Sequence, residues 1–189
     1  MARLVALLAA AMALLLAPVL VIGVITASFL APVTAATIAC RGSIGSSGDW
    51  RVPFVDTSYL ISSGFGMRFH PVRHVWALHN GVDLAAPQTT VVAASTGTIT
   101  AAGWDTSFGN RVIIDHGHGV STLYGHLAQI DPTIRIGLSV AIGQPLGIEG
   151  ATGYATGIHL HFTITINGTD IDPVPFMLDH GAPLNGQLE

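Results

Sequence analysis

The chain has 189 residues with 7 basic and 11 acidic side chains, which gives a formal net charge of −4 at pH 7. All the basic residues are arginines scattered along the chain, so the sequence lacks the basic patch that nucleic-acid binding requires. The one cysteine, Cys40, excludes an intrachain disulfide. The length suits one ordinary domain behind a leader segment.

The first 39 residues predict a segment directed to the membrane. No charged residue follows Arg3 in this stretch, and residues 4–25 would measure about 33 Å as a helix, enough to cross a bilayer. The sequence thus predicts a transmembrane helix with a cytoplasmic N-terminus and an exported remainder. Two alternatives stay open: a signal segment cleaved near residues 33–36, and lipidation of Cys40. Each places the folded part outside the cytoplasmic membrane, either membrane-anchored or secreted.

The rest of the chain predicts one β domain. Residues 40–52 are rich in Gly and Ser and read as a linker, whereas residues 178–189 lack a pattern and predict a loosely ordered tail. Between them, residues 53–177 show short β-branched runs broken by glycine, and no comparable stretch has helical periodicity. We therefore expect a mostly β, antiparallel domain. The predicted strands lie at residues 91–102, 111–115, 119–127, 138–148 and 159–166.

Histidine spacing indicates a metal site. His159 and His161 lie two apart in a predicted strand, so both imidazoles project to the same face. His79 and Asp83, four residues apart around Gly81, offer one nitrogen and one oxygen ligand. Two histidines and one aspartate leave a tetrahedral zinc with an open position for water, as in catalytic sites. The spacing alone does not decide whether His159 or His161 is the ligand.

A zinc hydrolase also needs a group that carries protons. The chain has only Glu149 and Glu189, and neither lies in an H-E-x-x-H motif, so histidine is the natural substitute. His126 follows Tyr124 by two residues in a predicted strand, and we expect both to enter the same cleft, Tyr124 as a substrate contact. With His126 in the cleft, the remaining histidine of the H-x-H pair is the second proton carrier.

Two further residues ahead of His79 are candidate substrate contacts. Arg68 offers the fork geometry that binds a carboxylate in two places, either on the substrate or in a structural pair with Asp56 or Asp115. His70, beside a proline, is the other candidate for contact with substrate.

Six short motifs occur in an order that resembles the lysostaphin/LytM-type zinc endopeptidases, which cut peptidoglycan cross-links. They are GFGMRFHP (64–71), HNGVD (79–83), VIIDHG (112–117), LYGHL (123–127), GQPLG (143–147) and TGYATGIHLHF (152–162). The resemblance spans residues 58–177. It implies a compact antiparallel β-sheet domain similar to the duplicated hybrid motif.

The resemblance also implies roles for individual residues. It makes His79, Asp83 and His161 the ligands of one zinc ion, and His126 and His159 the catalytic histidines. One departure is visible two residues after His161: family members usually carry glutamate there, whereas this chain has Thr163.

The expected function is hydrolysis of peptidoglycan stem or cross-bridge peptides outside the cytoplasmic membrane. Two alternatives remain at this point. One is a non-catalytic relative that binds cell wall or activates another hydrolase, although such relatives typically lose metal ligands. The other is a zinc-binding component of a secretion or conjugation machine in the cell envelope.

Overall fold

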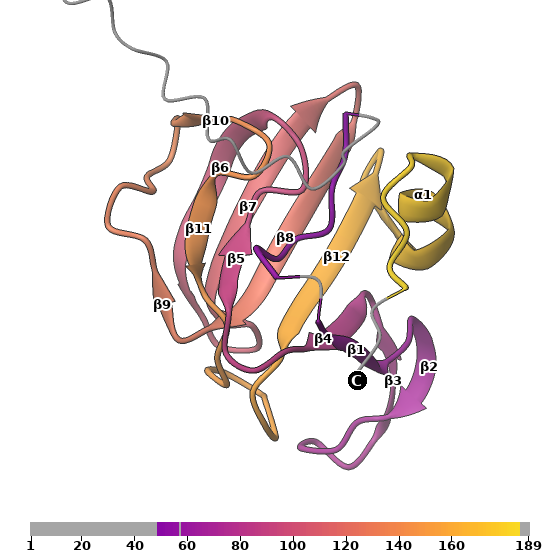
Figure 1. The fold of residues 1–189 in the computed structure, drawn as a ribbon. Helices are drawn as coiled ribbons and strands as arrows, with labels where there is room; N and C mark the ends of the chain where they lie inside the picture. Colours follow the sequence, from indigo (N-terminus) through magenta and orange to yellow (C-terminus); the bar gives the residue numbers. More distant parts are fainter. Residues whose placement is uncertain (1–48, 57, 186–189) are drawn as a thin grey trace, which may run out of the picture. The chain divides into compact units, whose positions relative to one another are not determined.

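The computed structural model describes residues 49–56 and 58–185. The predicted leader, Cys40 and most of the predicted linker lie outside these residues. Within the part described, no helix has the length and apolar character needed to span a bilayer. Figure 1 shows this part as a β-sheet structure with one short helix near its C-terminal end.

The strands of the described part are β1 (Leu60–Ser63), β2 (Gly66–Phe69), β3 (Trp76–His79), β4 (Val82–Ala85), β5 (Thr90–Val92), β6 (Gly97–Asp105), β7 (Gly109–Gly117), β8 (Val120–Leu127), β9 (Gln129–Ile130), β10 (Ser139–Val140), β11 (Pro145–Ile148), β12 (Leu160–Ile166) and β13 (Thr169–Ile171). The helix α1 spans Pro173–Asp179.

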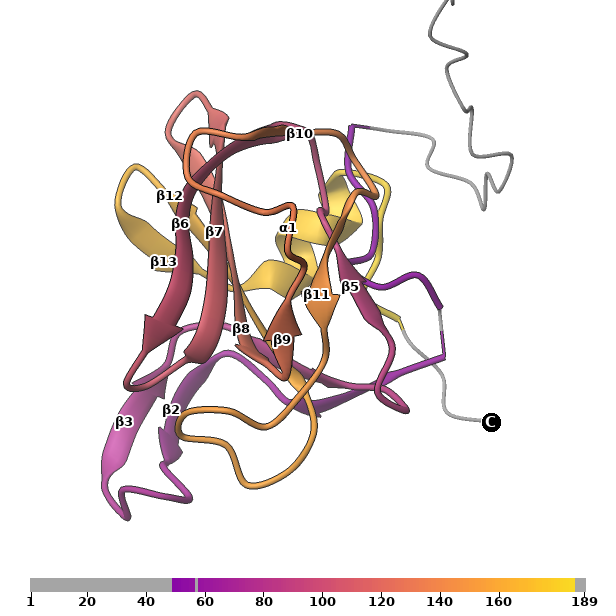
Figure 2. The same cartoon turned by 90° about the vertical axis from the view of Figure 1, so that its left-hand side faces the viewer.

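These strands form two antiparallel sheets and a hairpin. The large sheet has the order β1-β4-β12-β8-β7-β6-β10, with β13 added beside β12, and the smaller one has the order β5-β11-β9. Figure 2 shows the small sheet facing β6 and β7 of the large sheet. The third unit, β2 paired with β3, projects from the lower end of the domain in Figure 1.

The core fills the space between the two sheets. Leu160, Phe162 and Ile164 alternate along β12 and are fully buried, as the two-residue period of a strand requires. The small sheet contributes Val91 and Leu146, which are also fully buried in the same cluster. The predicted mostly β, antiparallel fold is thus confirmed.

The structure differs from the predictions in two ways: two predicted strands are each divided into two, and one helix is present that the sequence analysis did not predict. The predicted strand at 91–102 is divided between β5 and β6, and the one at 138–148 between β10 and β11. The helix α1 was not predicted. Its signals are local: the Asp172 side chain accepts a hydrogen bond from the Val174 N–H, and a proline occupies the first turn.

The packed part extends beyond the predicted limits of 53 and 177. Trp50, placed in the predicted linker, is buried and packs edge-on against Phe176 of α1, with ring centroids 4.9 Å apart. Ala182 and Leu184 are buried as well, so the prediction of a loosely ordered tail is wrong for the residues described after Met177. Short apolar stretches at both ends therefore complete the core.

Candidate active site

Two neighbouring strands of the large sheet supply the centre of the site. Asp83 on β4 and His161 on β12 are directly opposite partners in the antiparallel ladder. The residues next to them in sequence point into the core and are fully buried: Val82, Leu84, Leu160 and Phe162. Because successive side chains alternate, Asp83 and His161 lie side by side on the other face of the sheet.

The third side chain, His79, is the last residue of β3 and reaches this pair through a tight turn at Gly81. A Cβ atom at Gly81 would collide with the Phe162 carbonyl oxygen and lie 2.8 Å from Thr163 Oγ1. Only glycine lets the backbone pass so close to β12. The turn thereby places His79 and Asp83 against the same histidine.

His79, Asp83 and His161 form a small triangle of possible ligand atoms. Asp83 Oδ1 lies 3.0 Å from His79 Nε2 and 3.0 Å from His161 Nδ1, and the two nitrogens are 3.1 Å apart. Among the residues described, this is the group of His, Cys, Asp or Glu side chains suited to hold a metal ion. All three residues are buried.

The triangle fits zinc in geometry and in donor chemistry. Ligand atoms about 2.0–2.1 Å from a tetrahedral zinc are roughly 3.3–3.4 Å apart, so a small outward shift of the side chains opens the triangle enough. Two imidazole nitrogens and one carboxylate oxygen are a donor set of the kind found in catalytic zinc sites. The same set leaves a fourth position free.

Hydrogen bonds on the far side of each imidazole hold the ring in place. His79 Nδ1 lies 2.7 Å from the Gly64 carbonyl oxygen, which can only accept, so the proton of His79 is on Nδ1 and Nε2 is free to act as a ligand. His161 Nε2 lies 2.9 Å from Thr163 Oγ1. Burial lowers the pKa of His161, which favours the neutral imidazole that a metal requires.

Asp83 remains ionised in this buried position. Burial alone would raise the pKa of its carboxyl, but the close contacts with the His161 and His79 rings outweigh that effect and hold the pKa well below its usual range. The second oxygen, Oδ2, accepts a hydrogen bond from Arg68 Nη2 at 3.2 Å. The predicted alternatives for Arg68, Asp56 and Asp115, are wrong, because Arg68 pairs with the candidate ligand itself.

Two more histidines lie beside the triangle. His126 and His159 have ring centroids 4.7 Å apart, and His159 Nε2 is 3.6 Å from Asp83 Oδ1. His126 Nδ1 donates to the Thr152 carbonyl oxygen at 2.7 Å, and His159 Nδ1 donates to the Gly157 carbonyl oxygen at 2.9 Å. In the neutral form of each ring, Nε2 is therefore the nitrogen without a hydrogen. Burial lowers the pKa of His126 to about 4, so it is neutral at pH 7.

Tyr124 does not share the cleft with His126, and the prediction that it contacts substrate is wrong. Its side chain is fully buried, and its hydroxyl accepts a hydrogen bond from the Ala94 N–H at 2.9 Å. Burial raises the pKa of the phenol to about 12. The cause is a bulge: β8 uses three residue steps where β7 uses two, and His126 has φ 61°. The alternation of side chains is interrupted between the two residues.

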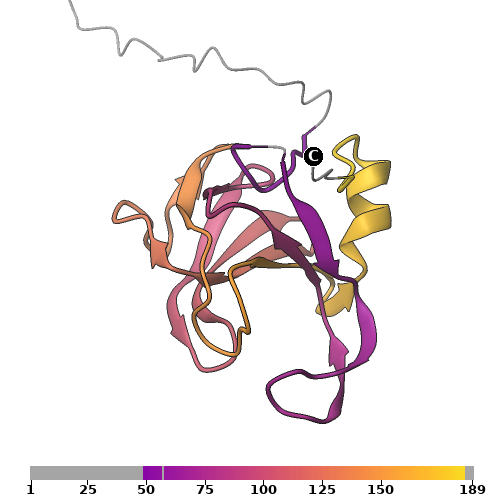
Figure 3. The same cartoon turned by 60° about the horizontal axis from the view of Figure 1, so that its bottom comes forward.

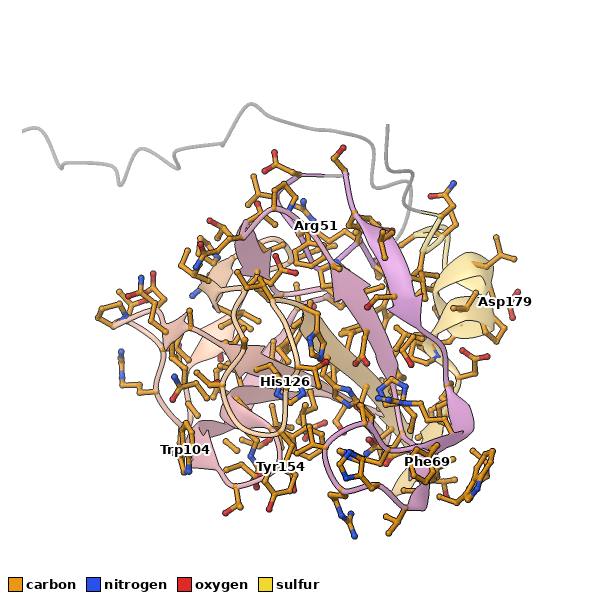
Figure 4. The ribbon with its side chains drawn as sticks, turned by 90° about the horizontal axis from the view of Figure 1, so that it is seen from below. Arg51, Phe69, Trp104, His126, Tyr154 and Asp179 are labelled. Atoms are coloured by element: carbon orange, nitrogen blue, oxygen red, sulfur yellow. The ribbon has the colours of Figure 1, made fainter. Side chains whose placement is uncertain are left out.

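The three side chains of the triangle line one cleft of about 590 Å³ together with His126 and His159. Figure 3 shows the hairpin β2–β3 and the loop after β11 extending on the same side of the domain. In Figure 4 His126 lies near the middle of this face, with Tyr154 and Phe69 on the two flanking segments. Of the predicted substrate contacts, His70 and Arg68 line the cleft.

The cleft also contains residues that the sequence analysis did not identify: Phe108, Arg73 and Tyr154. Phe108 packs against the His161 ring, with centroids 5.1 Å apart, and Tyr154 faces His70 edge-on at 6.4 Å. Tyr154 lies within the motif at residues 152–162 and Arg73 two residues after the motif at 64–71, whereas no motif adjoins Phe108. His70 Nδ1 accepts hydrogen bonds from the N–H groups of Val72 and Arg73, both at 3.2 Å, so the ring helps to shape the tip of the hairpin.

Comparison with known proteins agrees with this geometry. A model of peptidase family M23 matches residues 77–173, just over half of the chain. The chain belongs to peptidase family M23. The matched segment of this M23 domain contains His79, Asp83, His126, His159 and His161.

Relatives of this M23 domain include proteins named as endopeptidases. The DD-carboxypeptidase/endopeptidase Mpg of Neisseria meningitidis serogroup B is 46% identical over 119 residues, which are 62% of this chain and 27% of that protein. The peptidoglycan DD-endopeptidase ShyA of Vibrio cholerae serotype O1 is 38% identical over 120 residues, again 62% and 27%. The chain thus spans only about a quarter of each of these proteins.

Among solved structures, the catalytic domain of the antimicrobial peptidase lysostaphin from Staphylococcus simulans superposes with a TM-score of 0.57. It is 33% identical, and the match covers 64% of this chain and 92% of that one. A zinc-containing peptidase from Vibrio cholerae superposes with a TM-score of 0.59 at 34% identity, over 66% of this chain and 39% of that one. The M23 domain therefore has the lysostaphin-type fold.

Proposed function

We propose that this M23 chain is a zinc-dependent endopeptidase that hydrolyses peptide bonds in peptidoglycan cross-links outside the cytoplasmic membrane. The observation that carries the proposal is the triangle of His79, Asp83 and His161 with His126 and His159 beside it in one cleft. The name of the relative ShyA, a peptidoglycan DD-endopeptidase, supports peptidoglycan as the substrate. The apolar segment at residues 1–39 would deliver the domain to the cell envelope as a membrane anchor or a cleaved leader.

His79 Nε2, Asp83 Oδ1 and His161 Nδ1 are the atoms that would hold the metal. Zinc bound there would polarise a carbonyl group and bring the pKa of a water molecule toward about 7. Arg68 holds the Asp83 carboxylate in place, because it donates a hydrogen bond to Oδ2 and leaves Oδ1 for the metal.

His126 and His159 would carry out the proton transfer. Burial keeps His126 neutral at pH 7, and the Thr152 carbonyl oxygen holds its proton on Nδ1, so Nε2 is able to accept a proton from the attacking water. His159, held in the same way by Gly157, lies beside the triangle and can donate to the developing oxyanion once it carries a proton.

The charge of the cleft suits a substrate with a free carboxylate. Asp83 is the only acidic side chain among the described residues that line the cleft. Arg68 is engaged by Asp83, whereas Arg73, at the tip of the hairpin, makes no ion pair within the described part of the chain. We therefore assign the contact with a carboxylate of the stem peptide to Arg73 rather than to Arg68.

The test is digestion of purified sacculi by the full-length chain in detergent. Released muropeptides are identified by mass spectrometry, with zinc present and with the metal removed by a chelator. We expect release of cleaved cross-links only in the presence of zinc, and none from the His161→Ala variant. Binding to sacculi without any release would reject the proposal and support the non-catalytic alternative.

A further inference from the structure

Thr163 occupies a special place relative to the metal triangle. It lies on β12 two residues after His161 and on the same face of the strand, and it is 2% exposed. Its Oγ1 is 2.9 Å from His161 Nε2.

The contact decides which nitrogen of His161 is free for the metal. A neutral imidazole carries one proton, on either Nδ1 or Nε2. Nδ1 is the atom that faces Asp83 and His79, at 3.0 Å and 3.1 Å, so a ligand role requires the proton to be on Nε2. The His161 ring is buried away from water, and within the described residues Thr163 Oγ1 is the acceptor for that proton.

We propose that Thr163 is a positioning residue: its hydroxyl accepts the Nε2–H of His161 and so fixes both the tautomer and the orientation of the ring as a zinc ligand. Outer hydrogen bonds of this kind orient ligating histidines and raise their basicity. The inference depends on the zinc site proposed above, but it concerns the strength of binding rather than the reaction.

The surroundings of the hydroxyl leave little freedom for a substitute. The position of a Cβ at Gly81 would be 2.8 Å from Thr163 Oγ1 and 2.9 Å from His161 Nε2, so the Gly81 backbone closes one side of this contact. A valine at 163 fills the same volume as threonine, which leaves no space for a water molecule to replace the lost acceptor.

The experiment compares Thr163→Val with Thr163→Ser in the full-length chain. The zinc dissociation constant is measured by competition with a chromogenic chelator of known affinity, without any substrate. We expect Thr163→Val to bind zinc about 10- to 100-fold more weakly, as is typical when an outer partner of a ligand is lost. Thr163→Ser, which keeps the hydroxyl, is expected to recover most of the affinity.

Thermal unfolding of both variants without metal provides the folding control. A Thr163→Val variant that unfolds like the parent but binds zinc as tightly overturns the inference. So does a Thr163→Ser variant that binds as weakly as Thr163→Val, because shape rather than the hydroxyl would then be decisive. A parent chain that binds no zinc would overturn the proposed function itself. Failure of the Thr163 inference is therefore distinguishable from failure of the zinc site.

Discussion

His161 Nδ1 and Asp83 Oδ1 lie 3.0 Å apart because the two residues are direct partners on neighbouring antiparallel strands. The register of β4 against β12 therefore sets the distance between two candidate ligands. Any change that keeps this register but removes one donor tests the metal site without disturbing the sheet.

Loss of a ligand is expected to abolish zinc retention. In His161→Ala the remaining donors, His79 and Asp83, form only one edge of the triangle, which is too few for a stable catalytic zinc site. Elemental analysis of the purified variant after dialysis measures the bound zinc. Stoichiometric zinc in this variant would contradict the assignment.

Loss of His126 is expected to separate binding from turnover. His126→Ala should retain zinc, since His126 is not part of the triangle, while kcat/KM for cross-linked peptides falls by about 100-fold or more, a typical cost of losing a proton-transfer group. His118→Asn, at an exposed turn outside the cleft with φ 52°, serves as the matched control. Cleavage by His126→Ala at the parental rate would refute the role.

Tyr124→Phe is expected to affect stability but not activity. The buried Ala94 N–H loses its acceptor, which should lower the free energy of unfolding by about 1–3 kcal/mol. Denaturant titration measures this loss. Zinc affinity and turnover should remain at the parental level. A large fall in turnover of the folded variant would indicate that Tyr124 contacts the substrate after all.

Arg73→Gln is expected to lower activity on a peptide with a free carboxylate but not on the same peptide with that carboxylate amidated. A charge-assisted hydrogen bond contributes about 1.5–3 kcal/mol, so kcat/KM for the free carboxylate should fall about 10- to 100-fold, with little change for the amide. Arg135→Gln, outside the cleft, is the control. Equal losses on both peptides would show that Arg73 does not read the carboxylate.

The burial of Glu149 leads us to expect that the free energy of unfolding depends on pH. Its side chain is inaccessible to solvent, and burial raises the pKa of the carboxyl. The folded state therefore binds the proton of Glu149 more tightly than the unfolded state does. The stability that this proton contributes is fully present below the unfolded pKa of about 4.3 and is lost as the pH rises through the higher folded-state pKa. Glu149→Gln, which cannot ionise, should gain stability relative to the parent between pH 5 and pH 8. Chemical denaturation at both values tests this, and an unchanged difference contradicts it.

Local spacing in the sequence identified the candidate ligands but left His159 and His161 as alternatives for one of them. The intervals His79–Asp83 and His159–His161, and the alternation along residues 159–166, follow from the periods of turns and strands, which depend on near neighbours only. The mostly β class follows from the same periodicity. For this reason the four histidines and the aspartate of the site were candidates before any tertiary contact was known, whereas Phe108, Arg73 and Tyr154 were not.

Other features depended on contacts between distant segments. The bulge at His126, which turns Tyr124 into the core, arises from the pairing of β8 with β7. The pairing of Arg68 with Asp83 requires the hairpin to fold back over the site, and the hydrogen bond from His161 to Thr163 requires the His161 ring to take one particular orientation beside Gly81. None of these is encoded in a local period.

By itself the sequence determined which residues can bind a metal and transfer protons, because chemical type and short spacing are written directly in it. Only the tertiary structure decided which nitrogen of each ring faces the centre of the candidate site, which cleft arginine makes no ion pair among the described residues, and which side chains are buried outside the cleft. Those choices depend on strand register and burial, which come from the packing of residues far apart along the chain.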